Sequence, residues 1–402
     1  MILTYTSHAG GETPDAPRFA PWDKGIGDLS SSSPCSGVSL TPASDLQAAI
    51  NARPNGTTFC LQPGIYYLTK SIQTRSYDRF IGQAGVIFDG QGKVDKGLWG
   101  YGGDAGEVHV TVKNIVFQHF TVAAVRLGWY SYVAHNEMRD NQIGAWVNSH
   151  SALDANYIHD NSQYGITGGP GKDILIENNE LAHNNTSHDC GGTCIGNAGG
   201  SKIVGSTTGT QNLTWRNNYV HDNIGVGIWS DGNVSSSLYE YNRVTNNSGS
   251  GIEHEISWDA VVRYNTLTNN DSRHAGRSCG YGGQLIIANS TNVEAHGNTV
   301  TGSNGTNGIC AIDIHRPDVP APHSQAVANY YVHDNDIFMT DGASTGLVGR
   351  ASSLTANNRF VNNSYHVTDT TRRYWAWPGV SATWAAWQAL GRDTTGSLSR
   401  WP

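Results

Sequence analysis

Two short stretches of the sequence carry carboxylates at alternate positions. Asp231 stands in Gly-Ile-Trp-Ser-Asp-Gly-Asn (227–233), and Glu253 and Glu255 stand in Gly-Ile-Glu-His-Glu-Ile-Ser (251–257). Alternate side chains of a strand point to the same face of a sheet. The three carboxyl groups therefore share one face if the two stretches pair as neighbouring strands. Like-charged carboxylates at that range repel each other, and their clustering raises the pKa of at least one of them.

A carboxylic acid beside a carboxylate is the arrangement that hydrolyses glycosidic bonds. We therefore take Asp231 as the candidate nucleophile or base, and Glu253 or Glu255 as the candidate acid. If Asp231 and Glu255 stack, their Cα atoms lie about 4.8 Å apart, which suits the carboxyl separation of about 5–5.5 Å found in retaining enzymes. Asp231 and Glu253 lie on a diagonal of about 8 Å, which suits inversion. A solvated sheet face and a Ca²⁺ site are the other interpretations of the cluster.

Alignment of the repeats on their Gly-Ile positions predicts two outward rows of side chains. The first row is Arg126, Trp146, Thr167, Gly196, Trp229 and Glu253. The second row is Gly128, Asn148, Gly169, Ala198, Asp231 and Glu255. No Lys falls in either row. Because tryptophan rings stack on sugars and small residues leave a floor for a chain-like ligand, we expect Trp146, Trp229, Asn148 and Thr167 to bind substrate.

Two insertions interrupt the repeats at the bend that leads into this face, at 185–194 and 271–283. Long loops on one side of a solenoid commonly form the wall of a binding site. Further candidates for substrate binding at this rim are His188, Asp189, Trp258, Tyr281 and Arg316. His254 points inward by the alternation rule, and we expect it to be a hydrogen-bonded core residue.

The element that must position these residues is a short repeat. The pattern of Asn, any residue, an apolar residue, two more residues and Asn begins at 136, 156, 179, 218, 242, 265 and 358, with looser copies at 298 and 335. A period of 20–24 residues with short strand-like runs fits one coil of a solenoid of parallel strands. The recurring Asn then forms a ladder of side-chain amides. The His-Asp pairs at His159, His221 and His333 have a structural role by the same reasoning.

The chain ends are expected to close this solenoid, because terminal coils otherwise expose apolar surface and unpaired strand edges. The sequence predicts a capping helix at 41–56 that begins at Thr41 or Ser44 and stops at Pro54. The predicted division is an N-terminal arm at 1–40, the capping helix at 41–56, the solenoid at 57–365 and a C-terminal cap at 366–402, with an amphipathic element at 381–397.

The stretches FCLQPGIYYL (59–68) and DRFIGQAGVIFDGQG (78–92), with the repeats over 57–365, resemble the right-handed parallel β-helices of the pectate-lyase-like superfamily. The resemblance implies an all-β fold, a right-handed parallel β-helix with an N-terminal capping helix and a small C-terminal cap. It also implies a polysaccharide or oligosaccharide substrate, because the superfamily contains polysaccharide lyases, glycoside hydrolases and sugar epimerases. One scaffold carries several chemistries, so the fold alone does not select the reaction.

The chemistry we favour is glycoside hydrolysis without a cofactor. In the lyases that the chain resembles, Ca²⁺ sits in such a carboxylate cluster and neutralises a uronate, while an Arg or Lys removes a proton. A Ca²⁺-dependent lyase or epimerase acting on a uronate polymer, with Arg316 as the base, is therefore the alternative. A non-catalytic sugar-binding β-helix is the second alternative.

Composition narrows the partners and the compartment. The net charge of −8 argues against nucleic acid, and no run of about 18 apolar residues suggests a membrane span. The first residues lack a signal peptide's pattern, so the protein is not exported or its signal has been removed. The six Cys favour an oxidising compartment and secretion. Pairing of Cys35 with Cys60, Cys190 with Cys194 and Cys279 with Cys310 is one of 15 possibilities, with zinc ligation as the rival. We expect a monomer.

Overall fold

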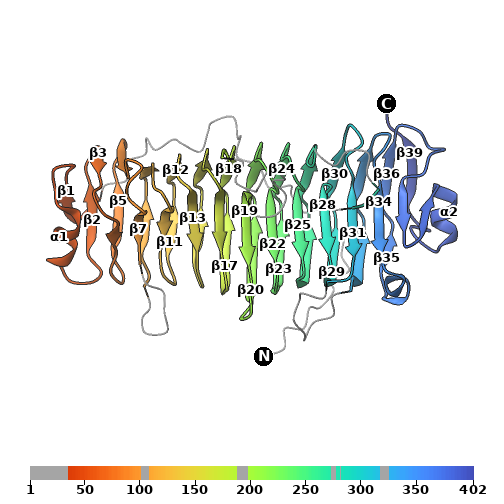
Figure 1. The fold of residues 1–402 in the computed structure, drawn as a ribbon, viewed down its shortest axis with the longest axis horizontal. Coiled ribbons are helices and arrows are strands. Elements are labelled where there is room, and N and C mark those ends of the chain that lie inside the picture. Colours follow the sequence, from red (N-terminus) through yellow and green to blue (C-terminus); the bar gives the residue numbers. More distant parts are fainter. Residues whose placement is uncertain (1–34, 101–107, 188–197, 273–277, 281, 317–325) are drawn as a thin grey trace.

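The computed structural model describes residues 35–100, 108–187, 198–272, 278–280, 282–316 and 326–402. In these residues the chain forms an elongated parallel β-helix whose coils stack along the long axis of the molecule (Figure 1). The predicted fold class is confirmed, because regular structure in the described part is strand apart from two short α-helices and one 3₁₀ helix.

Each coil contributes one strand to each of three sheets, which we name A, B and C in the order that the chain visits them. In the described residues each sheet has 13 strands, and every pairing is parallel except that of β37 with β38. Sheet A contains β1 (Val38–Leu40), β2 (Thr58–Leu61), β5 (Arg79–Gly82), β8 (Thr111–Lys113), β11 (Tyr132–Ala134), β14 (Ala152–Asp154), β17 (Gly171–Glu177), β20 (Thr210–Arg216), β23 (Val234–Glu240), β26 (Trp258–Arg263), β29 (Thr291–His296), β32 (Ala328–His333) and β35 (Arg359–Val361).

Sheet B contains β3 (Gly64–Tyr67), β6 (Val86–Asp89), β9 (Val116–Gln118), β12 (Glu137–Arg139), β15 (Tyr157–His159), β18 (Glu180–Ala182), β21 (Tyr219–His221), β24 (Arg243–Thr245), β27 (Thr266–Thr268), β30 (Thr299–Gly302), β33 (Asp336–Met339), β36 (Ser364–Val367) and β39 (Ser397–Arg400). Sheet C contains β4 (Ile72–Gln73), β7 (Lys96–Trp99), β10 (Ala123–Arg126), β13 (Ile143–Val147), β16 (Tyr164–Gly168), β19 (Gly199–Val204), β22 (Ile228–Asp231), β25 (Ile252–Glu255), β28 (Leu285–Ala288), β31 (Ile309–Asp313), β34 (Thr345–Gly349), β37 (Trp375–Trp377) and β38 (Val380–Ala382).

The inward side chains of the three sheets form one apolar core that runs from Leu40 to Trp387. Burial alternates along the strands, as in β20, where Leu213 and Trp215 are buried and the outward Arg216 is partly exposed. This alternation follows from the two-residue period of a strand. Outward residues of one strand therefore stack on outward residues of the next, and this stacking positions the candidate site.

At each of two bends in the coil, a residue in the left-handed backbone conformation precedes a buried Asn. At the bend from sheet A to sheet B, Nδ2 of each ladder Asn donates to Oδ1 of the next at 2.8–3.1 Å. This first ladder contains Asn136, Asn156, Asn179, Asn218, Asn242, Asn265, Asn298, Asn335 and Asn363, and it ends on Asp393. The predicted amide ladder is therefore confirmed, although the copy placed at 358 is out of register, because Asn363 occupies the equivalent position.

A second ladder lies at the bend from sheet B to sheet C. Its Nδ2 to Oδ1 distances are again 2.8–3.1 Å. The ladder contains Asn141, Asn161, Asn184, Asn223, Asn247 and Asn270, and it ends on Gln284. The sequence repeat thus encodes two rows of buried amides rather than one, because the Asn at each end of the repeated pattern turns the chain.

Helices cover the two ends of the β-helix, α1 (Leu46–Asn51) at the N-terminal end and α2 (Trp384–Ala389) at the other (Figure 1). The helix predicted at 41–56 is shorter than expected. Its N-cap is Asp45, whose carboxylate accepts from the Ala48 amide at 3.0 Å. Ser44 lies one residue before this N-cap, and its hydroxyl accepts from the Thr41 amide in the preceding turn.

Strand pairing extends beyond the predicted limits of the solenoid. At one end β1 (Val38–Leu40) pairs with β2, and at the other β39 (Ser397–Arg400) pairs with β36. A 3₁₀ helix spans Ala351–Thr355. In the described part of the chain, none of the helices is long and apolar enough to cross a membrane.

Two of the three proposed cysteine pairs are disulfides. Cys35 bonds to Cys60 and Cys279 bonds to Cys310. The third pair, Cys190 and Cys194, lies outside the described residues. Cys310 belongs to β31 in sheet C, so the second disulfide attaches the Cys279 segment to the sheet that carries the three candidate carboxylates.

Candidate active site on sheet C

The three candidate carboxylates lie on the adjacent strands β22 and β25. Asp231 pairs in register with Glu255, and Trp229 pairs with Glu253. Asp231 and Glu255 are therefore direct neighbours across the strands, while Asp231 and Glu253 lie on a diagonal. The alignment of these two coils in the sequence is confirmed, and its basis is their uninterrupted 24-residue spacing.

Lys202 is a residue of this cluster that the sequence alignment missed. Its ammonium Nζ lies 3.0 Å from Asp231 Oδ2, and its side chain is 9% exposed. The strand pairing puts Lys202 opposite Thr167 and Val204 opposite Asp231. The predicted neighbours Gly196 and Ala198 are therefore wrong by six positions, and so is the prediction that no Lys stands in the outward rows.

The error has a physical origin in the insertion at 185–194, which breaks the period. The signal that identifies the correct register is Gly200, which takes the same place at the bend as Gly165 and Gly227. A Cβ at Gly200 would lie 2.6 Å from the carbonyl oxygen of Gly227, and one at Gly165 would lie 2.6 Å from that of Gly200. A side chain at Gly165 or Gly200 would clash with the next coil, so the Gly two positions before Lys202 indicates the register of this strand.

A second cation, Arg316, contacts the cluster from the segment after β31. Its Nη1 lies 2.8 Å from Glu255 Oε1, and the Glu255 side chain is 8% exposed. From the sequence we predict that Arg316 binds substrate or acts as a base. The structure brings it to the cluster as the ion-pair partner of Glu255.

Glu253 is a carboxyl group whose protonation the site alters strongly. It is 4% exposed. Burial raises its pKa from the ordinary value of 4.5 to about 8, with the negative charges of Glu255 and Asp231 adding to the effect and Lys202 opposing it. A carboxyl group in this environment holds its proton at neutral pH. Each of the two other carboxylates lies beside a cation, Asp231 beside Lys202 and Glu255 beside Arg316.

His254 is a core residue, as predicted. It is fully buried, and burial lowers its pKa to about 3, so the imidazole is neutral. The Tyr239 hydroxyl lies 3.0 Å from His254 Nδ1 and donates to Ser230 Oγ at 2.6 Å. This polar group lies on the inward side of the strands that carry the carboxylates, so it supports the site from behind and does not reach its outward face.

The two tryptophans predicted as sugar platforms are covered by cations. Lys202 Nζ lies 3.5 Å from the centre of the Trp229 ring, and the Arg126 guanidinium carbon lies 4.1 Å from that of Trp146. Trp229 is only 4% exposed. One face of each ring is therefore occupied by a cation. That face is not available for a sugar to stack on.

The remaining candidates divide between structural contacts and other locations. Thr167 is buried, and its hydroxyl donates to the Lys202 carbonyl at 2.9 Å, which joins β16 to β19. Asn148 donates through Nδ2 to the Leu127 carbonyl. Trp258 begins β26 in sheet A, around the bend from Glu255. His188, Asp189 and Tyr281 lie outside the described residues.

The outward face of sheet C is apolar on the C-terminal side of the carboxylates. There Cys279, Ile286, Ala288, Cys310, Ile312 and Ala376 form a buried cluster separate from the main core. Ile286 and Ala288 follow Glu253 and Glu255 directly in the register. The carboxylate cluster is thus bounded on this side by a packed apolar cluster.

A polar cavity of about 800 Å³ lies where earlier coils enter sheet C. It is lined by residues that include Asp89, His119, Asp140, Gln142, Asp160 and Ser162. None of the three candidate carboxylates lines it. The cavity and the carboxylate cluster are therefore distinct features, and the chemistry is argued from the cluster.

Comparison with known proteins supports the fold. No family model and no curated protein matches the sequence. Among solved structures, the A-module of the mannuronan C-5 epimerase AlgE4 from Azotobacter vinelandii is 16% identical, with a TM-score of 0.57 over 75% of this chain and 91% of that one. The catalytic domain of a GH87 alpha-1,3-glucanase in complex with tetrasaccharides is 11% identical, with a TM-score of 0.58 over 92% and 69%.

The A-module of AlgE6 from the same organism is 13% identical, with a TM-score of 0.51 over 89% of this chain and 94% of that one. Each of these proteins, by its name, acts on a polysaccharide, one as a hydrolase and two as epimerases. At these identities the likeness establishes the parallel β-helix and does not select among the reactions.

Proposed function

We propose that this protein is a secreted enzyme that hydrolyses glycosidic bonds of a polysaccharide or oligosaccharide. The observation that carries the proposal is the pairing of two unlike carboxyl groups on one sheet face. Burial raises the pKa of Glu253 to about 8, whereas the Asp231 carboxylate lies 3.0 Å from the Lys202 ammonium. Carboxyl groups whose environments differ in this way serve as acid and base in the same site.

In the proposed mechanism Glu253 is the general acid and protonates the glycosidic oxygen as the bond to the leaving sugar breaks. Asp231 is the base that removes a proton from the attacking water. The two residues lie on a diagonal across β22 and β25, and standard strand spacings give such a diagonal a length of about 8 Å. A separation in that range leaves room for the water and favours inversion at the anomeric carbon.

The other charged residues have supporting roles in this mechanism. Lys202 holds the Asp231 carboxylate, and Arg316 holds Glu255 at 2.8 Å. The Glu255 carboxylate in turn keeps the proton on Glu253 through its negative charge. A polysaccharide as the substrate class is supported by the glucanase and the epimerases that share the fold, and secretion is supported by the two disulfides.

The test is a screen of neutral and acidic polysaccharides with product analysis, run on the parent, Asp231→Asn and Glu253→Gln. On the substrate that the parent cleaves, each variant should lose about 10²–10⁴-fold in turnover and still bind oligosaccharide. Glu294→Gln is the matched control, because Glu294 is an outward carboxylate on sheet A that lies away from the cluster. If both site variants match the parent, the assignment is wrong.

A second candidate is a lyase or epimerase acting on a uronate polymer. The observation that favours it is Lys202, which together with Arg316 supplies two cations at the carboxylate cluster, where the sequence offers only Arg316. One of them could neutralise a uronate or act as the base. The three carboxylates are oxygen ligands of the type that Ca²⁺ prefers, and Ca²⁺ would supply further positive charge to the substrate carboxylate.

The two candidates differ in their products and in their response to a chelator. A lyase would release an unsaturated sugar that absorbs in the ultraviolet, and a calcium-dependent enzyme of either kind would lose activity with a chelator and regain it with Ca²⁺. Hydrolysis gives saturated reducing ends and no ultraviolet signal. A third outcome, oligosaccharide binding with no product on any substrate and with Asp231→Asn binding unchanged, would support a sugar-binding module instead.

A further inference from the structure

Outside the carboxylate cluster, the bend from sheet B to sheet C gathers side chains that can bind a metal. On each coil a residue in the left-handed region precedes the Asn of the second ladder, and its side chain lies on the outside of the bend. His183 and Asp222 hold this position on neighbouring coils, each with a φ of 53°. They precede Asn184 and Asn223, which are consecutive rungs of that ladder.

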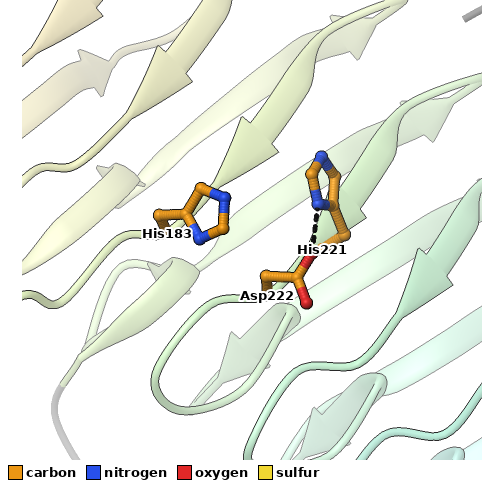
Figure 2. Close-up of side chains that lie close together, drawn as sticks. All are labelled: His183, His221 and Asp222. Carbon is orange, nitrogen blue, oxygen red and sulfur yellow. Dashed lines mark hydrogen bonds and ion pairs between the residues drawn. The ribbon is translucent and has the colours of Figure 1, made fainter. Parts of the chain in front are cut away.

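His221 completes the group from the end of strand β21. The nitrogen and oxygen donor atoms of His183, His221 and Asp222 all lie within 4.8 Å of one another. Figure 2 shows the two imidazoles on neighbouring coils with the Asp222 carboxylate beside them. His221 Nδ1 lies 2.7 Å from Asp222 Oδ2, and His221 Nε2 lies 3.2 Å from Glu180 Oε1. A second carboxylate is therefore within reach of the same imidazole.

The same His-Asp arrangement recurs twice without this convergence. His159 lies 2.6 Å from Asp160, and His333 lies 2.6 Å from Asp334. Each ring also meets a Glu on a neighbouring strand, as His221 does. The pair alone is therefore a structural element of the repeat. Among the described residues, the group that includes His183 is the one whose donors gather closely enough to hold an ion.

We propose that His183, His221 and Asp222 bind one divalent transition-metal ion of the zinc type. Two imidazole nitrogens and one carboxylate oxygen form a ligand set that zinc accepts, with water as the fourth ligand. Donors around a tetrahedral zinc ion lie about 3.4 Å apart, given bonds of about 2.0–2.1 Å. The side chains of His183 and Asp222 are exposed, so closing the remaining gap requires no repacking of the core.

The ion would join two coils at the entry to the candidate site. His183 belongs to the coil of β18, and His221 and Asp222 belong to the coil of β21. The chain runs from Asp222 through the buried Asn223 into β22, which ends at Asp231. Bound metal would therefore hold the bend that leads into the strand of the proposed base. The site is independent of the proposed reaction, because none of its three ligands belongs to the carboxylate cluster.

The test is zinc binding by the full chain, prepared without a histidine tag and stripped with a chelator. Calorimetric titration with Zn²⁺ should give one site per chain. His183→Asn should weaken that site at least tenfold, and Asn is chosen because it tolerates the left-handed conformation that His183 adopts. The matched control is His135→Asn, since His135 is also exposed and left-handed, with a φ of 56°, and lies at another bend.

A second pair of variants separates the site from unspecific binding by other histidines. Asp222→Asn should weaken zinc binding, whereas Asp160→Asn, at the same bend two coils away, should leave it unchanged. The melting temperature of the parent should rise with Zn²⁺, and that of His183→Asn should not. The proposal would be overturned if the parent bound clearly less than one Zn²⁺ per chain, or if the parent and His183→Asn bound Zn²⁺ with equal affinity. Neither outcome depends on the catalytic activity.

Discussion

Glu253 lies where burial and the charges of neighbouring residues act on a single proton. It is 4% exposed, and the negative charges of Glu255 and Asp231 add to the effect of burial in raising its pKa. A residue of this kind has consequences for both rate and stability, because its protonation differs between the folded site, the unfolded chain and the working enzyme.

The first prediction concerns the pH dependence of the rate. If Glu253 is the general acid, it must be protonated, so kcat/KM should fall on the alkaline side with an apparent pKa near the value of about 8. Glu253→Gln should remove most of the activity and the alkaline limb together. The measurement is a pH–rate profile on the substrate that the screen identifies. A parent profile that is flat through this region would contradict the assignment of the acid.

The second prediction concerns stability. The folded protein keeps the Glu253 proton up to about pH 8, whereas the unfolded chain releases it near 4.5. Unfolding therefore releases a proton between these values, and the free energy of unfolding falls as pH rises through that window. Glu253→Gln carries no such proton. It should be more stable than the parent above pH 8 by a few kcal/mol, with little difference at acid pH. Denaturant unfolding at both pH values checks this.

At the scale of the element, the two Asn ladders decide how tightly a coil is held. Asn247 is fully buried in the second ladder, where its Nδ2 donates to Asn270 Oδ1 at 2.8 Å and to the Val220 carbonyl at 3.1 Å. Its chain neighbour Asn246 is exposed and left-handed, with a φ of 56°. Two adjacent residues of one type therefore occupy opposite environments.

This contrast gives the third prediction. Asn247→Asp replaces a buried donor by a carboxylate that can only accept, so carbonyl groups lose their donor and a charge is buried without a cation. The free energy of unfolding should fall by about 3–5 kcal/mol. Asn246→Asp makes the same change at an exposed position that tolerates Asp, and it should alter stability by less than about 0.5 kcal/mol. Chemical denaturation of both variants is the measurement, and equal effects would refute the structural role of the ladder.

The regularity of the coils decides which features of the fold and the site can be predicted from the sequence. The ladders follow from the repeated Asn because identical polar residues at a fixed period must stack in a solenoid. The register of β22 on β25 follows for the same reason. Lys202 was missed because the insertion before β19 removes the period, and only the glycine at the bend carries the register across it. Arg316 contacts Glu255 from a segment that follows a strand two coils away, and periodicity does not specify such a segment.

The sequence also does not predict which of the three carboxyl groups in the cluster keeps its proton. The clustering of three carboxylates predicts that one pKa rises, but not which one. The outcome depends on burial and on which residues have cationic partners. Lys202 pairs with Asp231 and Arg316 pairs with Glu255, and burial together with the two neighbouring carboxylates raises the pKa of Glu253. Those partners come from coils and segments whose positions only the folded chain defines.

At the scale of the whole molecule, an open-ended stack of coils needs protection at its ends. Helix α1 covers the first coil with Leu46 and Ile50, which are buried in the main core. Without this cover the apolar interior and the edge of the first coil would be available to another molecule. We therefore expect the cap to affect the association state as well as the stability.

The fourth prediction tests this cap. Ile50 is 1% exposed, so Ile50→Asp should destabilise the N-terminal end by about 3–5 kcal/mol and expose the stack to self-association. Ala48→Asp is the control, because Ala48 lies on the exposed side of the same helix. Sedimentation velocity should show the parent and the control unchanged and Ile50→Asp forming larger species. A monodisperse, stable Ile50→Asp protein would show that the helix is dispensable.

The first Asn ladder has a direction as well as a pattern. Each amide donates one Nδ2 hydrogen to Oδ1 of the next rung and the other to a carbonyl of the preceding coil, and the last amide, Asn363, donates to the Asp393 carboxylate at 2.8 Å. Asp393 is fully buried and also accepts from Trp387 of helix α2 at 2.9 Å. Asp393 thus links the last rung of this ladder to helix α2, so the C-terminal cap is hydrogen-bonded to a continuous row of amides that begins many coils earlier at Asn136.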